Sequence, residues 1–509
     1  MKHLVLTICG CLFGLYGFSQ PSQQAQVGPY TYDFYDDNNT CILTDIVEDV
    51  SGELTLPSSV VFNEKNYAVT SIGSPSHSYF GESPSNHVAN VTKLIIPEGV
   101  QKITCSFSAF HHAHSIIIPS TVTSLTYTRF SPNLSEGYHA DWFDYSTLPT
   151  TLAYMTFYDL ENIEILSDHL SFKSIDGVLY SKDGKTLILC PRGRKGEFVI
   201  PDGVERLENK SFYGCNQLEK ITLPASLKEL GDNPVDIIAE TGEWMWNYKE
   251  AYVFAFCFSI HKIQLPDVEY ISAHTFYYCW SLEHFVIPAT TKWIASNAFE
   301  GDWGLETIDW NNCQLEEIGN KAFSFKNGNK PPLYTLSLPF HVKSIGTLAF
   351  ENCLAPEILV LSADLEHLGE SFVSFYHENS SANASERLAP VKAIYNYRIE
   401  PLDVGESVFG LDEVRRGRIT EKQFPQTWAD NCVLYVPIGS ADAYKAHGIW
   451  GRFKNIQEFD TTTGIKKMEK PSNVNTHVYD LMGRTVIGKP QKGLYLINGK
   501  KVVVTNSVH

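Results

Sequence analysis

Three histidines within four positions are the first residues whose types could do chemistry. His111, His112 and His114 lie close together, and His111 with His114 could share a metal ion. A zinc site needs further Cys, His or carboxylate ligands at a suitable spacing, and none lies at matching spacing around this cluster. The cluster therefore predicts a solvated turn, with no metal and no cofactor.

The acidic stretch from Asp33 to Asn38 resembles a calcium loop in composition only. The regular alternation of ligands and the final Glu of an EF-hand are absent. A hairpin turn accounts for these residues better. Asp183-Gly184 within "SKDGK" likewise predicts a hairpin with a type I′ turn.

Cysteine is frequent but does not form metal-binding pairs. Cys9 and Cys11 belong to an apolar leader, which leaves nine of the 11 cysteines. Several of these follow a Phe in a repeated Phe-x-x-Cys pattern, namely Cys215, Cys257, Cys279 and Cys353. This pattern predicts small buried side chains in a column, whereas a zinc knuckle would need Cys-x-x-Cys pairs. A bridge between Cys257 and Cys279 is the alternative, which parallel Cβ vectors would disfavour.

No catalytic constellation is visible. The sequence contains no Gly-x-Ser-x-Gly, His-Glu-x-x-His, P-loop or dinucleotide fingerprint. A polysaccharide-degrading β-solenoid enzyme stays as an alternative, because stacking could bring carboxylates together from distant parts of the chain. Such an enzyme needs charged residues clustered on consecutive turns. The outward positions here are a mixed polar set, so we predict a protein that is not an enzyme.

Aromatic residues in segments that interrupt the sequence pattern are the candidate binding residues. The segments lie near 131–154, 232–252 and 376–427, and loops that leave a rigid scaffold often carry binding residues. Exposed Trp and Tyr could stack on sugars or anchor a protein partner, or they could fold back over a local apolar cluster. The candidates are Trp142, Tyr145, Trp244, Trp246 and Tyr248.

The elements that must position these loops are short strands in a repeating unit. Each unit has an apolar strand ending in Pro, then two aliphatic residues and a Phe, as in Pro201, Val204, Leu207 and Phe212. Units of about 22–24 residues, repeated over many turns, indicate a β-rich solenoid in which each turn buries its apolar face against its neighbours. The predicted structural core is the column of Phe212, Phe254, Phe276, Phe299, Phe323 and Phe350.

Composition and the N-terminal residues predict that the protein is exported. Residues 1–19 read as a signal peptide, with Lys2, an apolar run from Leu4 to Phe18, and a cleavage site before Gln20. Lipidation at Cys11 is a competing interpretation. The net charge of −18 argues against nucleic acid or an anionic membrane as partner, and no other stretch is long enough to span a membrane.

Taken together, these motifs resemble the BspA-like leucine-rich-repeat surface proteins of Bacteroidetes. "GELTLPSSV" resembles the opening repeat of that family, and "DGVLYSKDGKTLILCP" resembles its hairpin-bearing repeat. "CVLYVPIGSADAYKAHGIWGRFKNIQEF" resembles its terminal unit, with Trp450 and Phe453 as a plug of the open core. The resemblance implies leucine-rich repeats over residues 20–460.

The C-terminal residues form a separate prediction. After a linker at 461–475, residues 476–509 are expected to form a small β module, with strands in "VYDLMGRTV" and "GLYLINGKKVVV". This module resembles the C-terminal sorting domain of the type IX secretion pathway, although its tail is short.

The resemblance implies a function in binding at the cell surface. Members of the family are associated with adhesion, so we expect a secreted or outer-membrane adhesin or interaction scaffold. Its partner would be a host extracellular matrix protein, another surface protein or a glycan. A glycan-binding module is the alternative function.

Overall fold

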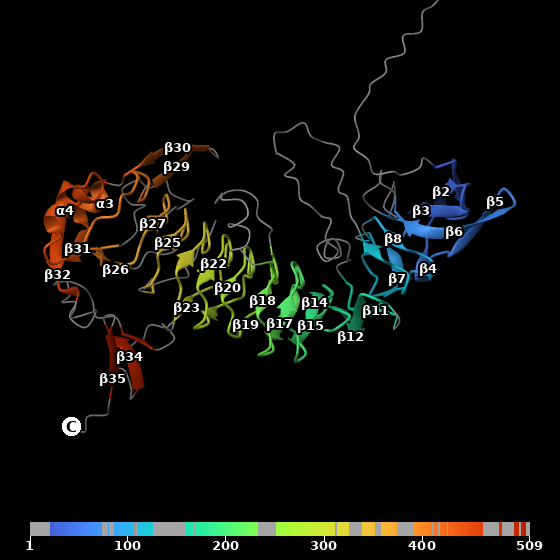
Figure 1. The fold of residues 1–509 in the computed structure, drawn as a ribbon, viewed down its shortest axis with the longest axis horizontal. Coiled ribbons are helices and arrows are strands. Elements are labelled where there is room, and N and C mark those ends of the chain that lie inside the picture. The colour runs from blue at the N-terminus through green and yellow to red at the C-terminus, as the bar shows by residue number, and fades with distance from the viewer. Residues whose placement is uncertain are drawn as a thin grey trace, which may run out of the picture.

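The protein is mostly strands with very few helices, arranged as an arc of stacked turns (Figure 1). The structure is a computed structural model. It describes residues 21–73, 80, 86–105, 107, 109–125, 159–166, 169–232, 251–310, 313–324, 338–339, 341–351, 358–373, 391–409, 411–415, 418–424, 426–461, 478–480, 493–497 and 500–504. The predicted signal peptide, residues 462–475 of the predicted linker, the lipidation candidate Cys11 and the Phe-x-x-Cys residue Cys353 lie outside the described residues.

The N-terminal sheet begins antiparallel and then becomes parallel. Its strands are β1 (Gln23–Val27), β2 (Tyr30–Tyr35), β3 (Thr40–Ile46), β5 (Ser59–Phe62), β6 (Lys65–Ile72), β8 (Lys102–Ile103) and β10 (Ser124–Leu125). β1, β2 and β3 form an antiparallel meander, after which β6, β8 and β10 add in parallel. The hairpin turn expected at Asp33 to Asn38 is confirmed, because the β2–β3 hairpin turns just after Tyr35.

A second parallel ladder runs along the other side of the same turns. It joins β4 (Ser51–Thr55), β7 (Asn90–Ile95), β9 (Ser115–Ile118) and β11 (Asn162–Ile165). Apolar side chains alternate inward along these strands, as the pairing of Leu54 with Leu94 and then Ile116 illustrates. Each turn thus contributes one strand to each of two ladders.

The hairpin-bearing repeat lies in the middle of the chain. β12 (Phe172–Ile175), β13 (Val178–Ser181) and β14 (Thr186–Leu189) are antiparallel, and β16 (Arg206–Leu207) and β18 (Glu229–Leu230) continue in parallel from β14. The hairpin is confirmed, but the predicted type I′ turn is wrong. Only Gly184 of the loop has a positive φ, at 82°. Oδ1 of Asp183 accepts from Oγ of Ser181 and from N of Lys185, which favours an ordinary turn followed by a left-handed glycine.

Two ladders of short parallel strands follow through the centre of the arc. One ladder contains β15 (Lys195–Val199), β17 (Gln217–Thr222) and β19 (Lys262–Ile263), followed by the pair β21 (His284–Val286) and β23 (Thr307–Asp309). The other contains β20 (Tyr270–Ile271), β22 (Trp293–Ile294), β24 (Glu317–Ile318), β25 (Ser344–Ile345) and β27 (His367–Leu368). Every pairing joins equivalent positions of successive turns, so side chains of the same repeat position form columns.

The Phe column lies on the axis between these ladders. Phe212, Phe254, Phe276, Phe299, Phe323 and Phe350 are all 0% exposed. Neighbouring rings are 5.0–5.4 Å apart between centroids. The backbone N–H of each of these Phe residues also donates to a carbonyl of the next turn at 2.8–2.9 Å. The column therefore joins the turns through both rings and backbone.

The C-terminal end of the stack is closed by aromatic residues. β26 (Ile358–Leu361), β28 (Ala393–Asn396), β31 (Val433–Pro437) and β32 (Asn455–Phe459) form a parallel ladder, beside α3 (Gln426–Asn431), α4 (Ala441–Ala446) and η2 (Trp450–Arg452). Trp450 is fully buried, and its indole N–H donates to O of Leu402 at 2.8 Å. Trp450 and Phe453 both pack against Phe409. These contacts cover the last turn of the core.

Regular strands occur within the predicted insertion near 376–427. β28 continues the parallel ladder, while β29 (Leu411–Arg415) and β30 (Arg418–Gln423) form an antiparallel hairpin. At the C-terminus, β33 (Val478–Asp480), β34 (Gly493–Ile497) and β35 (Lys500–Val504) form an antiparallel sheet, as expected from the strand patterns there. Within the described residues, no helix is long and apolar enough to cross a membrane.

The apolar core is divided into two large clusters at the hairpin. One cluster extends from the N-terminal sheet to Leu189, and the other from Val178 to the C-terminal aromatic residues. β13 contributes to both, because Val178 and Tyr180 face one cluster while Leu179 faces the other. The hairpin strands thus form a two-sided wall in the middle of the stack, meaning that side chains on their opposite faces belong to different clusters.

Truncating one ring of the Phe column should cause a large loss of stability. Phe276 contacts a ring on each side, so Phe276→Ala leaves a cavity that the stacked turns cannot close, and we expect a loss of about 3–5 kcal/mol. Urea unfolding measures this loss. Val286→Ala, at a side chain 51% exposed, is the control and should change stability by about 0.5 kcal/mol or less. Equal losses in the two variants would contradict the role of the column.

Candidate functional site

The aromatic loop residues predicted from sequence lie outside the described residues. Trp142, Tyr145, Trp244, Trp246 and Tyr248 all fall in segments that the structure does not describe. The two ends of the second segment, however, are described at Asp232 and Ala251. The site can therefore be built from these two ends and from the surface that continues beside them.

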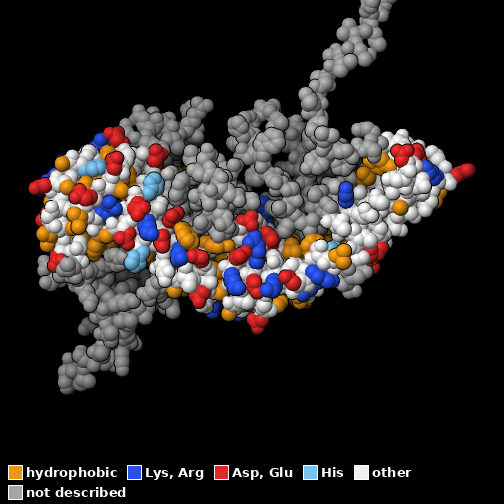
Figure 2. Space-filling model, in the orientation of Figure 1, with side chains coloured by type: hydrophobic (Ala, Val, Ile, Leu, Met, Phe, Trp, Pro, Cys, Tyr) orange, Lys and Arg blue, Asp and Glu red, His pale blue; other side chains and the backbone are white. Residues whose placement is uncertain are grey.

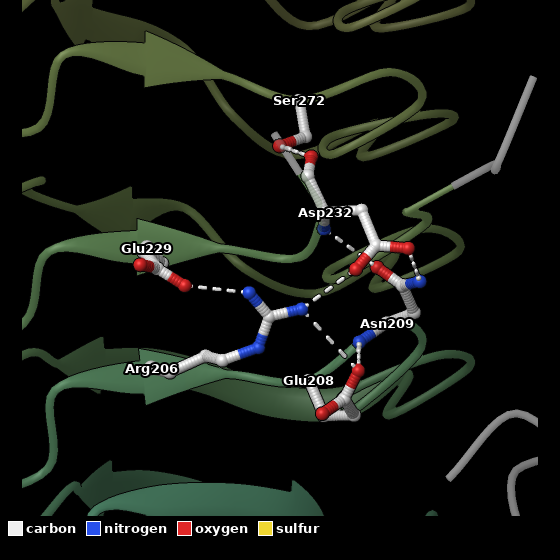
Figure 3. A network of polar contacts seen from close by, with 6 residues as sticks. All are labelled: Arg206, Glu208, Asn209, Glu229, Asp232 and Ser272. Atoms are coloured by element: carbon white, nitrogen blue, oxygen red, sulfur yellow. Dashed lines mark hydrogen bonds and ion pairs between the residues drawn. The ribbon is translucent and has the colours of Figure 1, made fainter. Parts of the chain in front are cut away.

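A polar network holds the point where the 232–252 segment leaves the stack (Figure 3). Arg206 on β16 donates to Oδ1 of Asp232 at 2.8 Å and to Oε2 of Glu229, on the next turn, at 2.6 Å. The same guanidinium lies 3.5 Å from Oε1 of Glu208. Three carboxylates thus surround one cation whose side chain is only 24% exposed.

Backbone and amide groups complete this network. Asn209 exchanges two hydrogen bonds with Asp232, since its Nδ2 donates to Oδ2 and its Oδ1 accepts from the backbone N, both at 2.9 Å. Oγ of Ser272, from a later turn, donates to the carbonyl of Asp232 at 2.9 Å. Asp232 is therefore fixed through its side chain, its N–H and its carbonyl.

The returning end of the segment is fixed on the same turn. The carbonyl of Ala251 accepts from N of Lys210 at 2.7 Å, and the carbonyl of Val253 accepts from N of Phe212 at 2.9 Å. Ala251 and Val253 are both buried. The segment thus begins and ends on one rigid turn, an arrangement that suits a binding loop.

Beside this returning end, sequence reasoning missed a row of aromatic side chains at the surface. Phe258, Trp280 and Trp303 hold the same position in three successive turns, four residues after the core Phe. We call these three residues the aromatic row. Their ring centroids are 4.3 Å and 5.2 Å apart, and Trp280 and Trp303 are 39% and 37% exposed. Extending the Phe-x-x-Cys pattern by one residue would have found the row, because each member directly follows the Cys position.

A second aromatic pair lies beside the row in an unusual backbone conformation. Phe256 and Tyr278 have φ of 60° and 58°, in the left-handed region. Equivalent positions of flanking turns carry Gly214 and Gly301, for which this conformation has no steric penalty. Aromatic residues there cost about 1–2 kcal/mol each. Tyr278 contacts both indoles, with centroids 6.3 Å from Trp280 and 6.1 Å from Trp303.

The cysteine column is buried and structural. Sγ of Cys257 donates to O of Phe212, and Sγ of Cys279 donates to O of Phe254, both at 3.1 Å. Burial raises the pKa of both thiols well above the ordinary value, which suppresses the reactive thiolate. The Cys257–Cys279 bridge is not formed, and the eight described cysteines are all free and buried.

Asp302 stands in the cysteine position of the next turn. It is fully buried, and its Oδ1 accepts from N of Cys279 at 2.6 Å. Its Oδ2 has no hydrogen-bond partner within the described structure. Burial raises the pKa of this carboxyl well above its ordinary value. With its carboxyl enclosed in the core, Asp302 takes part in packing and cannot reach a ligand in solvent.

The histidine cluster lies on an exposed turn. Nδ1 of His112 is 3.4 Å from Oδ2 of Asp159, and Nδ1 of His114 is 3.2 Å from the carbonyl of Asp159. In the parts of the chain that the structure describes, no group of three His, Cys, Asp or Glu residues could hold a metal ion.

Charged side chains of both signs are interspersed on the face shown in Figure 2. Elsewhere in the stack, three pairs join adjacent turns at 2.7 Å, namely Lys220 with Glu197, Lys292 with Glu269, and Lys343 with Glu316. Such exposed pairs contribute little stability, about 0–1 kcal/mol. Among the side chains that Figure 2 colours, positive and negative groups alternate without an extended patch of one sign.

Known proteins share the repeat pattern of this chain. A model of the BspA type leucine rich repeat region matches six copies over residues 80–177, 195–236 and 249–382, more than half of the chain. No curated protein is significantly similar.

Several solved structures are similar at low identity. The pneumococcal vaccine antigen PcpA is 15% identical, with 87% of this chain and 100% of that chain covered and a TM-score of 0.35. A leucine-rich repeat protein from Bacteroides ovatus is 19% identical, with 74% and 71% covered and a TM-score of 0.37. A leucine rich cell surface protein from Faecalibacterium prausnitzii is 18% identical, with 73% and 98% covered and a TM-score of 0.31. Similarity this distant says nothing about what the chain binds.

Removing the cation of the network should destabilise the turn that carries the 232–252 segment. Arg206→Met leaves Glu208, Glu229 and Asp232 without their shared partner, and we expect a loss of about 1–3 kcal/mol in urea unfolding. Lys228→Met is the control, because Lys228 is 71% exposed and 3.9 Å from Glu205. A loss no larger than the control's would show that the network is unimportant for stability.

Asp302 should make the protein less stable as pH rises. The folded-state pKa is raised, so the unfolded chain releases this proton above about pH 4 while the folded protein retains it. Stability present below the ordinary pKa is therefore lost as pH rises, by about 1.4 kcal/mol for each pH unit over which the folded protein retains the proton and the unfolded chain does not. Asp302→Asn should lose less stability between pH 4 and pH 7 and be the more stable protein at pH 7.

Urea unfolding at the two pH values measures this difference. Asp267→Asn, at an exposed carboxyl, should keep the pH dependence of the unmodified protein. The same pH dependence in Asp302→Asn would contradict the assignment.

Proposed function

Because this chain belongs to the BspA-type leucine-rich repeat family, we propose that it is a secreted or cell-surface binding scaffold that acts as an adhesin. Proteins of this family are surface proteins, and leucine-rich repeat proteins bind other proteins. Its partners would be host extracellular matrix proteins or other macromolecules on host or bacterial surfaces. The predicted signal peptide at 1–19 supports export, and the C-terminal module at 476–509 would act as a sorting signal.

The observation that carries the proposal is the rigid attachment of the 232–252 segment. Asp232 and Ala251 are held by hydrogen bonds to neighbouring turns, at the end of a segment that contains two Trp and one Tyr within five residues. A loop whose two ends are already fixed has fewer conformations to lose on binding than a segment with free ends. Trp and Tyr also contribute disproportionately to binding free energy in protein interfaces.

The repeated turns would provide the rest of the binding surface. We expect them to form one continuous solenoid, whose length offers many weak contacts that act together. A glycan-binding module is the second candidate function, because exposed aromatic side chains also stack on sugars. A polysaccharide-degrading enzyme is the weakest alternative, since the sequence carries none of the catalytic motifs named above.

The test is solution binding of the protein to host matrix proteins, mucins and polysaccharides. We expect saturable binding to one of these classes, and new reducing ends or unsaturated products in none of them. Self-association without binding to any of them would overturn the proposal in favour of a structural role in the surface layer.

Removing both indoles of the 232–252 segment should weaken that binding. Trp244→Ala with Trp246→Ala is expected to lower affinity about tenfold or more without lowering the melting temperature, if the rings contact the ligand. Trp293→Ala, at a half-buried indole on β22, is the control. A lower melting temperature with unchanged affinity would show that Trp244 and Trp246 are packing residues.

A further inference from the structure

The Phe column begins one turn after the hairpin-bearing repeat, which carries a cysteine in place of the Phe. N of Cys190 donates to O of Ser211, just as N of Phe212 donates to O of Val253 one turn later. In both cases the acceptor is the residue that directly precedes the Phe of the following turn. Cys190 therefore stands at the Phe position of its own turn, and it is fully buried.

The cysteine of the next turn reaches the same stretch of backbone. Sγ of Cys215 lies 3.6 Å from O of Cys190 and 3.7 Å from O of Pro191. Sγ of Cys190 lies 3.8 Å from that same oxygen of Pro191. Burial raises the pKa of Cys190 well above its ordinary value, and a hydrogen bond with the thiol of Cys215 adds to this effect. The two thiols thus lie beside one carbonyl oxygen and contact each other.

This pair of thiols differs from the pair that the sequence suggested. Cys257 and Cys279 hold the same position in successive turns, so their Cα–Cβ bonds are expected to run parallel. Each of these two thiols donates to a Phe carbonyl oxygen at 3.1 Å. Cys190 and Cys215 hold different positions, because one replaces the Phe and the other follows a Phe by three residues. Their side chains are therefore not held parallel and can converge, as a disulfide requires.

The apolar contact at this end of the Phe column does not depend on Cys190. Phe198 on β15 lies 5.9 Å from Phe212 between ring centroids, and both rings are buried. A ring from β15 thus packs on the first Phe of the column, and position 190 carries a small side chain. The thiol at 190 is a departure from the repeat that ring packing alone does not explain.

From these contacts we infer that Cys190 and Cys215 form a disulfide when the exported chain folds, which fastens the hairpin-bearing repeat to the following turn. The structure shows the reduced form, in which both thiols are free. The predicted signal peptide supplies the setting, since disulfides form in oxidising compartments. A bond that closes the loop between 190 and 215 would stabilise the protein mainly by restricting its unfolded chain. This modification is additional to the proposed function and does not depend on the ligand.

The reaction needs an oxidant, and its chemical class is a small-molecule disulfide such as glutathione disulfide. The thiolate of one cysteine attacks a sulfur of the oxidant, whose S–S bond breaks, and the second cysteine then displaces the thiol that remains attached. Two S–H bonds of the chain are replaced by one S–S bond, and the two electrons and two protons leave in two molecules of reduced thiol.

Burial decides when this exchange takes place. Cys190 and Cys215 are both 0% exposed in the folded protein, and burial suppresses the thiolate of Cys190. The exchange therefore takes place during folding, while this turn is still open. Once the turn has closed, the same burial protects the bond from reductants.

The experiment refolds the full chain from urea with reduced and oxidised glutathione, blocks the remaining thiols by alkylation and maps the peptides by mass spectrometry. We expect a Cys190–Cys215 bridge, with Cys257 and Cys279 alkylated. The oxidised protein should melt at least about 2 °C above the same protein after reduction. Circular dichroism confirms that each sample is folded.

Two variants connect the bond to this rise in melting temperature. Cys215→Ser should leave Cys190 alkylated and remove the difference between the oxidised and reduced samples. Cys279→Ser is the matched control, because it removes a buried thiol of the same column, and it should keep both the bond and the difference.

The peptide map of the unmodified protein decides the inference by itself, so a variant that fails to fold leaves the test intact. Alkylated Cys190 and Cys215 in the folded protein would overturn the inference. A mixture of bridges in which Cys257 is joined as often as Cys190 would overturn it as well. None of these results bears on ligand binding, which remains the separate test of the proposed function.

Discussion

The stacking of one turn on the next at the Phe position is the constraint on which the rest of the structure depends. Each Phe ring contacts the ring of the following turn, and each Phe N–H bonds to the following turn as well. Because register is fixed there, every other position of the repeat also forms a column. The cysteine thiols, the ion pairs between turns and the aromatic row all follow from this one register. The surface of the stack is in this sense determined by the repeat and by the positions at which single turns depart from it.

The sequence predicted what depends on periodicity. The Phe pattern identified side chains that are fully buried, and the terminal unit placed Trp450 and Phe453 where they cover the core. The burial of Cys215, Cys257 and Cys279 also followed, because a small side chain recurring once per turn must form a column. All of these conclusions need only the repeat length and the apolar character of the side chains.

The features that the sequence did not predict depend on hydrogen bonds, burial and backbone conformation within single turns. The loop after β13 adopts an ordinary turn because the side chain of Asp183 accepts hydrogen bonds from Ser181 Oγ and Lys185 N. The association of Asp-Gly with type I′ turns does not take these hydrogen bonds into account. The aromatic row was missed because attention went to the insertions, while its members lie inside regular repeats. Asp302 places an ionisable group in the cysteine column. Its raised pKa depends on its burial, which the sequence alone does not show. Phe256 and Tyr278 occupy a backbone conformation that their residue types disfavour.

The two-sided wall formed by β13 and β14 bears on how the molecule comes apart. In a stack of repeats, each turn depends mainly on its neighbours, and cooperativity weakens wherever the contact between neighbours is different in kind. Here Leu179 faces one apolar cluster and Val178 and Tyr180 face the other, so this hairpin separates the two clusters. We therefore expect partial unfolding to begin at this seam, with the turns on one side opening while those on the other side stay folded.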